Sequence, residues 1–109
     1  MRELYCEVHD EDRFSRELII EFISKTPGIS IITGISRPAD IIFFDTNYGD
    51  PKQITEDNNA QLVVISSDYQ DIHHLFQNHI VDYLYKPDLS YPRFRNTIDR
   101  IRNNLSQVR

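Results

Sequence analysis

The chain has 109 residues, of which 39% are hydrophobic and 27% are charged, an ordinary balance for one globular domain. A domain of this length buries roughly 65% of the surface of its unfolded chain, which is enough for a hydrophobic core. No apolar run approaches the ~20 residues that a membrane-spanning helix needs, and no basic-then-apolar leader indicates secretion. The only cysteine, Cys6, excludes an internal disulfide. We therefore expect a cytoplasmic protein that makes no contact with a membrane.

Charge is unevenly distributed along the chain. Residues 1–85 carry fifteen acids and six bases, a net charge of −9, whereas residues 86–109 carry six bases and two acids, a net charge of +4. An acidic body does not favour contact with a phosphate backbone, so we expect no direct binding of nucleic acid by this chain. The basic residues near the C-terminus fit the solvated face of a helix better than a nucleic-acid patch.

Apolar patterning predicts the elements in chain order. Residues 4–9 (LYCEVH) form a short strand, and residues 13–25 carry apolar side chains at helical spacing until Pro27 and Gly28 end the helix. Later strands are predicted at residues 29–36, 39–44, 61–66 and 80–85, with a helix over residues 70–80 before the last of them. A terminal helix is predicted from a stripe of apolar residues, namely Phe94, Ile98, Ile101 and Leu105.

The alternation of hydrophobic strands with helices predicts an α/β fold with a parallel sheet. Two of the connections are unusual. Little more than residues 36–38 separates the second strand from the third, and residues 46–60 are polar with poor helical periodicity. Parallel neighbours normally need a crossover of about a dozen residues. We therefore expect the second and third helices of the fold to be reduced.

Polar side chains follow four of the predicted strands. They are Asp10 and Glu11 after the first strand, Asp45 after the third, Ser66 after the fourth and Lys86 after the fifth. In a parallel sheet these strand ends meet at one edge. Three carboxylates there need compensating positive charge, which a hard cation such as Mg²⁺ and a nearby lysine would supply. Carboxylate, metal and lysine together are typical of phosphoryl transfer to a carboxylate.

Three segments of the chain resemble response-regulator receiver domains. They are DEDRFSRELIIEFISKTPGIS (residues 10–30), DIIFFDTN (residues 40–47) and VVISSDYQDIHHLFQNHIVDYLYKP (residues 63–87). The similarity is closest to the receivers of LytTR-type transcription regulators. It implies that residues 1–109 form one receiver domain with the CheY-like (flavodoxin-like) three-layer fold, in which a five-stranded parallel sheet has the order 2-1-3-4-5.

The resemblance also implies a role for each residue at the sheet edge. Asp45 would accept a phosphoryl group from a histidine kinase. Asp10, Glu11 and Asp45 would hold Mg²⁺, with the backbone carbonyl of Asn47 as a further ligand. The metal acid at position 11 is a glutamate, where the family more often has the shorter aspartate.

Three further residues would couple phosphorylation to a change of surface. Ser66 would be the switch hydroxyl, Lys86 would hold the phosphoryl group, and Tyr83 would be the aromatic switch. The family usually has a cis peptide bond before the proline, so Lys86–Pro87 is the expected position. The surface that changes would lie on the 70–80 helix, the fifth strand and the terminal helix, through which the chain could form a homodimer.

Other interpretations remain open from the sequence alone. Asp12 fits the N-cap of the first helix, Ser66 and Lys86 taken singly fit a strand end and a surface lysine, and Tyr83 fits a core residue. The chain could be a degenerate receiver that binds partners without being phosphorylated. A small phosphatase with Asp45 as nucleophile is disfavoured, because DTN lacks the second acid that haloacid-dehalogenase-like enzymes carry two residues later. Output to transcription would require a DNA-binding domain that is not present in this chain.

Overall fold

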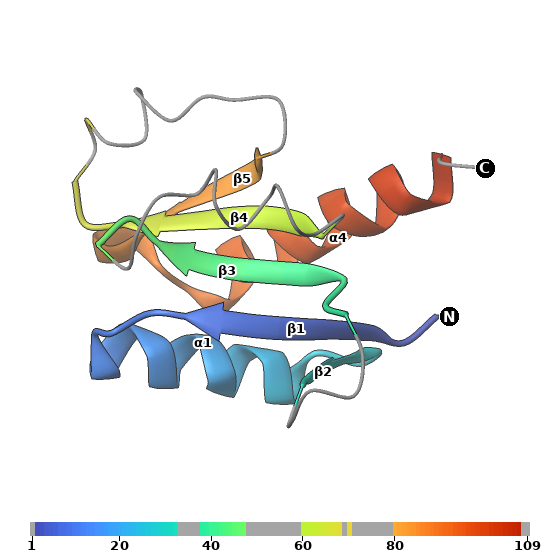
Figure 1. Cartoon of the computed structure of the whole chain (residues 1–109), viewed down its shortest axis with the longest axis horizontal. Helices are drawn as coiled ribbons and strands as arrows, with labels where there is room; N and C mark the ends of the chain where they lie inside the picture. The colour runs from blue at the N-terminus through green and yellow to red at the C-terminus, as the bar shows by residue number, and fades with distance from the viewer. Residues whose placement is uncertain (1, 33–37, 48–59, 69, 71–79, 108–109) are drawn as a thin grey trace.

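The computed structural model describes residues 2–32, 38–47, 60–68, 70 and 80–107. Five parallel strands form one sheet in the order β2-β1-β3-β4-β5, which confirms the predicted order (Figure 1). The strands are β1 (Leu4–His9), β2 (Ile29–Ile31), β3 (Ile41–Asp45), β4 (Gln61–Ser66) and β5 (Ile80–Tyr85). The helices are α1 (Arg13–Lys25), the 3₁₀ turn η1 (Lys86–Asp88) and α4 (Tyr91–Gln107). Within these residues no helix is long and apolar enough to cross a membrane.

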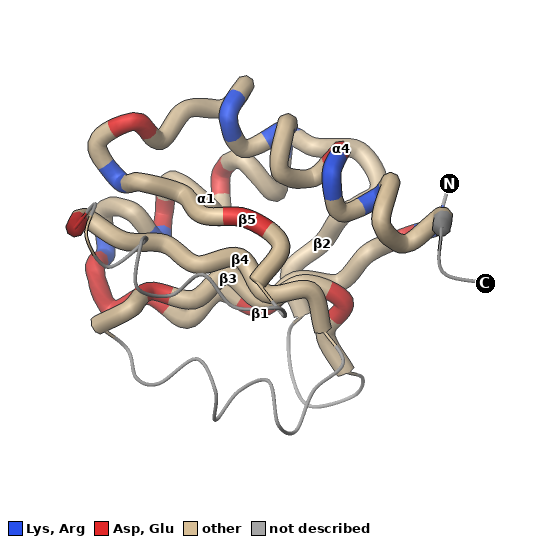
Figure 2. Tube along the Cα trace, turned by 90° about the horizontal axis from the view of Figure 1, so that it is seen from above, with Lys and Arg blue, Asp and Glu red and all other residues tan. Residues whose placement is uncertain are grey.

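The central strand β3 is buried on both of its faces. Ile41 and Phe43 face the side that α1 and α4 cover, and Ile42 and Phe44 pack in a second cluster on the opposite side. Figure 2 shows both helices on one side of the sheet. Because successive side chains of a strand point to opposite faces, burial on both sides requires an uninterrupted hydrophobic run. This explains why four apolar residues precede Asp45.

Aromatic rings join the two helices to the sheet. The ring centroid of Phe94 on α4 lies 5.6 Å from that of Phe22 on α1 and 5.5 Å from that of Phe43 on β3. Burying one such ring contributes about 1.5–3 kcal/mol. The thiol of Cys6 lies in the same cluster and is buried. The first and last helices are therefore fixed against the central strands of the sheet.

Helix α1 begins and ends at the predicted signals. The side chain of Asp12 accepts a hydrogen bond from the Phe14 N–H at 3.0 Å, which makes Asp12 the N-cap and confirms that interpretation. At the other end the Thr26 N–H donates to the Ile23 carbonyl at 3.1 Å. Gly28 then takes a φ of 83°, a left-handed conformation that glycine adopts without a steric cost, and the chain turns into β2.

Some predicted boundaries differ from the observed ones. Strand β3 begins at Ile41 and not at residue 39, because the Asp40 carboxylate accepts the Tyr5 N–H at 2.9 Å. Strand β2 ends at Ile31. Residues 33–36 of the predicted second strand, most of the connections expected to hold reduced helices, and all but the ends of the predicted 70–80 helix lie outside the described residues.

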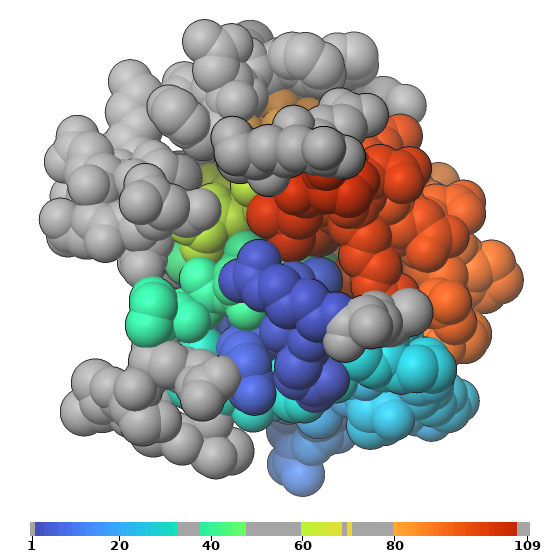
Figure 3. Space-filling model, turned by 90° about the vertical axis from the view of Figure 1, so that its right-hand side faces the viewer, coloured from blue at the N-terminus to red at the C-terminus, as the bar shows by residue number. Residues whose placement is uncertain are grey.

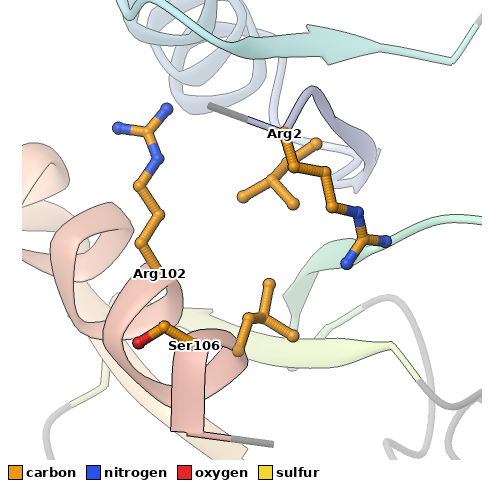
Figure 4. A pocket seen from close by; sticks show the side chains of 5 residues that line it. Arg2, Arg102 and Ser106 are labelled. Carbon is orange, nitrogen blue, oxygen red and sulfur yellow. The ribbon is translucent and has the colours of Figure 1, made fainter. Parts of the chain in front are cut away.

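The amino ends of the strands form the edge of the sheet shown in Figure 3, where residues near the N-terminus (blue) lie beside α4 (red). A cavity of about 290 Å³ opens here, lined by Arg2, Leu4, Arg102, Leu105 and Ser106. Figure 4 shows the two guanidinium groups pointing away from each other, so they do not converge on a common point. The carboxyl ends of the strands lie at the opposite edge.

Candidate functional site

The candidate site lies at the carboxyl edge of the sheet, where parallel strands end side by side. Asp10 follows β1, Asp45 is the last residue of β3, and Lys86 follows β5. Asp10 and Asp45 are 3% and 2% exposed, so both carboxyl groups are almost entirely removed from solvent. The structure thus brings together two of the predicted acids and the predicted lysine.

Lys86 is the positive charge of the site. Its Nζ forms an ion pair with Asp45 Oδ2, and it lies 3.5 Å from Asp10 Oδ1 and 3.4 Å from Asp12 Oδ2. Burial alone would lower the pKa of this lysine, but the hydrogen bond to Asp45 and the charges of Asp10 and Asp45 outweigh it and raise the pKa. Lys86 is therefore held as an ammonium ion among three carboxylates.

The surroundings of Asp10 act on its pKa in opposite directions. Burial raises its pKa, and the neighbouring Asp45 carboxyl raises it further. Hydrogen bonds from the Ser15 hydroxyl to Oδ2 and from the Asp12 N–H to Oδ1 at 3.0 Å favour the charged form and act in the opposite direction. The net result is a raised pKa, so additional positive charge at this point would stabilise the Asp10 carboxylate.

The two carboxylate oxygens of Asp45 have different partners. Oδ1 accepts the Asn47 N–H at 2.7 Å, a local turn that fixes the side chain at the end of β3. Oδ2 pairs with the Lys86 ammonium. The carboxylate consequently points toward the edge of the sheet and not into either hydrophobic cluster.

Of the two predicted switch residues, Ser66 lies near the end of β3 and Tyr83 lies within β5. The Ser66 hydroxyl is buried, accepts the Asp68 N–H at 3.0 Å, and lies 3.4 Å from the Thr46 hydroxyl. Tyr83 is half-buried against the second hydrophobic cluster, on the side of the sheet opposite the two helices. Ser66 therefore reaches the site through the residue that follows Asp45, and Tyr83 lies three residues before η1 begins.

Glu11 does not join the buried acids. Its side chain is exposed, and within the described residues no group of three or more acidic, histidine or cysteine side chains is placed to hold a metal ion. The buried pair of Asp10 and Asp45 nevertheless fits a hard divalent cation, because two carboxylates share one ammonium and Mg²⁺ prefers carboxylate oxygens. The acid that the structure adds at the lysine is Asp12.

The peptide bond between Lys86 and Pro87 is trans, which corrects the cis bond implied by the resemblance. Pro87 stands at the start of η1, where the Leu89 N–H donates to the Lys86 carbonyl at 3.1 Å. The fixed φ of proline suits the first residues of a helical turn, and the trans form is the preferred isomer.

A second ionic cluster, which sequence reasoning missed, joins β5 to α4. The carboxylate of Asp82 accepts hydrogen bonds from two guanidinium nitrogens of Arg93 at 2.9 and 3.0 Å and from the Thr97 hydroxyl at 2.7 Å. Arg93 also donates to the Tyr83 carbonyl, and the Tyr83 N–H donates to Asp82, both at 2.8 Å. The cluster therefore holds the backbone of Tyr83 from both sides.

The acid of this second cluster is buried, whereas the Arg93 side chain is 37% exposed. Burial would raise the pKa of Asp82, but the hydrogen bonds from Arg93 and Thr97 outweigh it and lower the pKa. The sequence did contain a pattern that indicates this ion pair. Asp82 alternates with Tyr83 and shares the inward face of β5 with Leu84, and an acid at such a position needs a basic partner.

No family model and no curated protein matches this chain. Among solved structures, the signal receiver domain of the response regulator NarL from Mycobacterium tuberculosis is similar, with a TM-score of 0.68 and 13% sequence identity. That likeness covers 94% of this chain and 98% of the NarL domain. The response regulator domain of CheB from Thermotoga maritima has a TM-score of 0.66 and 20% identity, covering 94% of this chain and 96% of that domain. The chain therefore has the fold of receiver domains.

Proposed function

We propose that residues 1–109 form the receiver domain of a two-component response regulator, which accepts a phosphoryl group on Asp45 from a histidine kinase. In this role the chain is a signalling domain that is itself modified and does not turn over a substrate. The observation that carries the proposal is the buried Asp45 carboxylate at the end of β3, paired with Lys86 and next to Asp10. The receiver fold supports it.

In the proposed reaction a carboxylate oxygen of Asp45 attacks the phosphorus of a phosphohistidine. The bond from phosphorus to the imidazole nitrogen breaks, and a bond from phosphorus to the Asp45 oxygen forms. Oδ1 accepts the Asn47 N–H and Oδ2 pairs with Lys86, so we assign the attack to Oδ2, the oxygen beside the lysine that would hold the phosphoryl group. The Lys86 ammonium then lies where the incoming phosphoryl oxygens need positive charge.

Mg²⁺ would neutralise the negative charge that accumulates around the phosphoryl group. Asp10 and Asp45 would hold the ion, and we keep Glu11 and the Asn47 carbonyl as its proposed further ligands. Asp10 would contribute a carboxylate that burial makes costly to ionise without such a cation. The Ser15 hydroxyl and the Asp12 N–H already hold that carboxylate in place.

The proposed output is a change of surface that starts at Ser66 and Tyr83. Ser66 would turn its hydroxyl to the phosphoryl group, and Tyr83 would move into the space that Ser66 leaves. The surface formed by the 70–80 helix, β5 and α4 would then favour a homodimer. As in the LytTR-type regulators that the sequence resembles, the domain would control transcription in the cytoplasm through a DNA-binding domain.

The alternative is a degenerate receiver that binds partner proteins without phosphorylation. It is favoured by the exposed position of Glu11, since the described residues show no three-acid group for a metal. The two functions differ in one property, the capacity of Asp45 to form an acyl phosphate.

The test is incubation of the protein with acetyl phosphate and Mg²⁺, followed by intact mass measurement. We expect one added phosphoryl group, sensitive to hydroxylamine, in the wild-type protein and none in Asp45→Asn. Asp99→Asn is the matched control, because Asp99 is an exposed acid on α4, outside the site. Failure of the wild-type protein to take up phosphate, with its fold intact, would favour the degenerate receiver.

A further inference from the structure

Asp12 makes two separate contacts with its two carboxylate oxygens. Oδ1 accepts the Phe14 N–H at 3.0 Å and caps α1, whereas Oδ2 lies 3.4 Å from the Lys86 ammonium. The capping role was predicted from the sequence, and the second contact joins residues that are 74 positions apart. Asp12 is thus a link between the start of α1 and the end of β5.

The position of Asp12 complements the two buried acids. Asp10 and Asp45 contact the lysine from the interior, and the Asp12 side chain is 50% exposed at the mouth of the site. A lysine has a flexible four-carbon stem, and its ammonium is strongly hydrated, so solvent competes for it. The Asp12 carboxylate, on the solvent side of the ammonium, takes a position that water would otherwise occupy.

We infer that Asp12 is a positioning residue, which holds the Lys86 ammonium over Asp45 and ties it to the N-terminus of α1. Its relevance to phosphoryl transfer rests on the proposed function, but the anchoring of Lys86 does not. The helix cap makes the anchor rigid, because the Phe14 N–H fixes the orientation of the carboxylate. Asp12 would act through Lys86 and would not contact the phosphoryl group.

Two substitutions separate anchoring from capping. Asparagine caps helices about as well as aspartate, so Asp12→Asn keeps the bond to the Phe14 N–H. With its oxygen engaged there, the amide presents its NH₂ group to Lys86, and two donors face each other. Asp12→Ala removes both contacts. A smaller fall in melting temperature for Asp12→Asn than for Asp12→Ala would show that the cap is kept in one variant and lost in the other.

The first measurement is the rate of acyl-phosphate formation from acetyl phosphate at saturating Mg²⁺. A partly exposed ion pair changes an equilibrium by a small factor, so we expect both variants to react roughly two- to fivefold more slowly than the wild-type protein. If Asp12 were only a cap, Asp12→Asn would react at the wild-type rate and Asp12→Ala alone would be slower. That outcome would overturn the inference.

The second measurement needs no phosphorylation. The Lys86 ammonium group gives an NMR signal that can be assigned by its loss in Lys86→Arg. We expect this signal to shift or broaden in Asp12→Asn, while the backbone amides of α1 beyond its first turn stay at their wild-type positions. An unchanged signal would overturn the inference. If the wild-type protein takes up no phosphate, the proposed function fails, and this measurement still decides whether Asp12 anchors Lys86.

Discussion

The surroundings of Asp10 favour binding of a cation and destabilise the protein when no cation is bound. Its carboxylate is buried beside Asp45, and the two acids share one lysine, so one negative charge lacks a full partner. Such groups lower the stability of the protein in exchange for function. The hydrogen bond from the Ser15 hydroxyl reduces the cost without removing it.

We predict that Asp10→Asn stabilises the Mg²⁺-free protein at neutral pH by about 1 kcal/mol, because the amide has no charge to desolvate. Urea unfolding would measure the change. Asp88→Asn, at an exposed acid on η1, is the control and should stay near the wild-type value. Adding Mg²⁺ should stabilise the wild-type protein and leave Asp10→Asn nearly unchanged. A destabilised Asp10→Asn would show that the Asp10 charge is already compensated.

At the scale of single residues, the sequence indicated Asp10, Asp45 and Lys86 as site residues, but it did not indicate that Asp12 contacts the lysine. Asp10, Asp45 and Lys86 could be identified because each follows a hydrophobic strand. The three consecutive acids at positions 10–12 do not reveal that Asp12, in addition to Asp10, contacts the lysine. That depends on the cap, which directs Asp12 to Lys86, while Glu11 is left exposed.

At the scale of elements, β5 and α4 are joined by the Asp82 cluster. The pKa of Asp82 is lowered in the folded protein, so its charged form is more favourable there than in the unfolded chain. A group of this kind contributes stability above its unfolded pKa of about 4, and the contribution is lost as the pH falls through the lower folded value. The cluster should therefore weaken in acid.

We predict that Asp82→Asn destabilises the protein at pH 7 by roughly 1.5–3 kcal/mol, the range for hydrogen bonds to charged groups. The difference from the wild-type protein should be constant above pH 5 and narrow below about pH 4. Chemical unfolding at several pH values measures it, with Asp99→Asn as an exposed acid that lacks such partners. If the difference in unfolding free energy did not depend on pH, the cluster would stabilise the protein through packing and not through the charge of Asp82.

The elements themselves were the most predictable part of the chain. The bounds of α1 followed from Asp12 and from Pro27 and Gly28, and the stripe of α4 proved to be its buried face from Phe94 to Ile101. The local pattern indicated that Asp82 needs a basic partner, but it did not identify that partner. Its partners come from two elements, and only tertiary packing brings the guanidinium of Arg93 to the inward face of β5.

At the scale of the whole molecule, the acids of the site and the basic residues of α4 lie in different regions (Figure 2). Asp82 is buried and paired with Arg93, so this acid does not face an interface between two copies. Arg100 reaches Asp82 at 3.4 Å, but its side chain is 59% exposed, and the neighbouring Asp99 is exposed as well. Arg100 and Asp99 are therefore two exposed charges of α4 through which a second copy could bind.

We predict that beryllofluoride with Mg²⁺, which mimics a phosphoryl group, shifts the protein from monomer toward dimer in analytical ultracentrifugation. Asp45→Asn should not respond, because the mimic has no carboxylate to bind. Arg100→Glu should bind the mimic but dimerise more weakly, since it reverses a charge in the proposed interface. An unchanged mass, with unchanged amide signals around Tyr83, would favour the degenerate receiver instead.

The burial of Cys6 makes the protein convenient to label. Cys6 is the only cysteine of the chain, and its thiol lies in the hydrophobic core. Burial, reinforced by the charges of Asp40 and Glu3, raises the pKa of this thiol to about 12, so almost no reactive thiolate forms at neutral pH. A cysteine placed at an exposed position such as Ser24 on α1 can therefore receive a fluorophore or a spin label while the native cysteine stays in place. Distances between two labelled copies could then be followed as the site is filled.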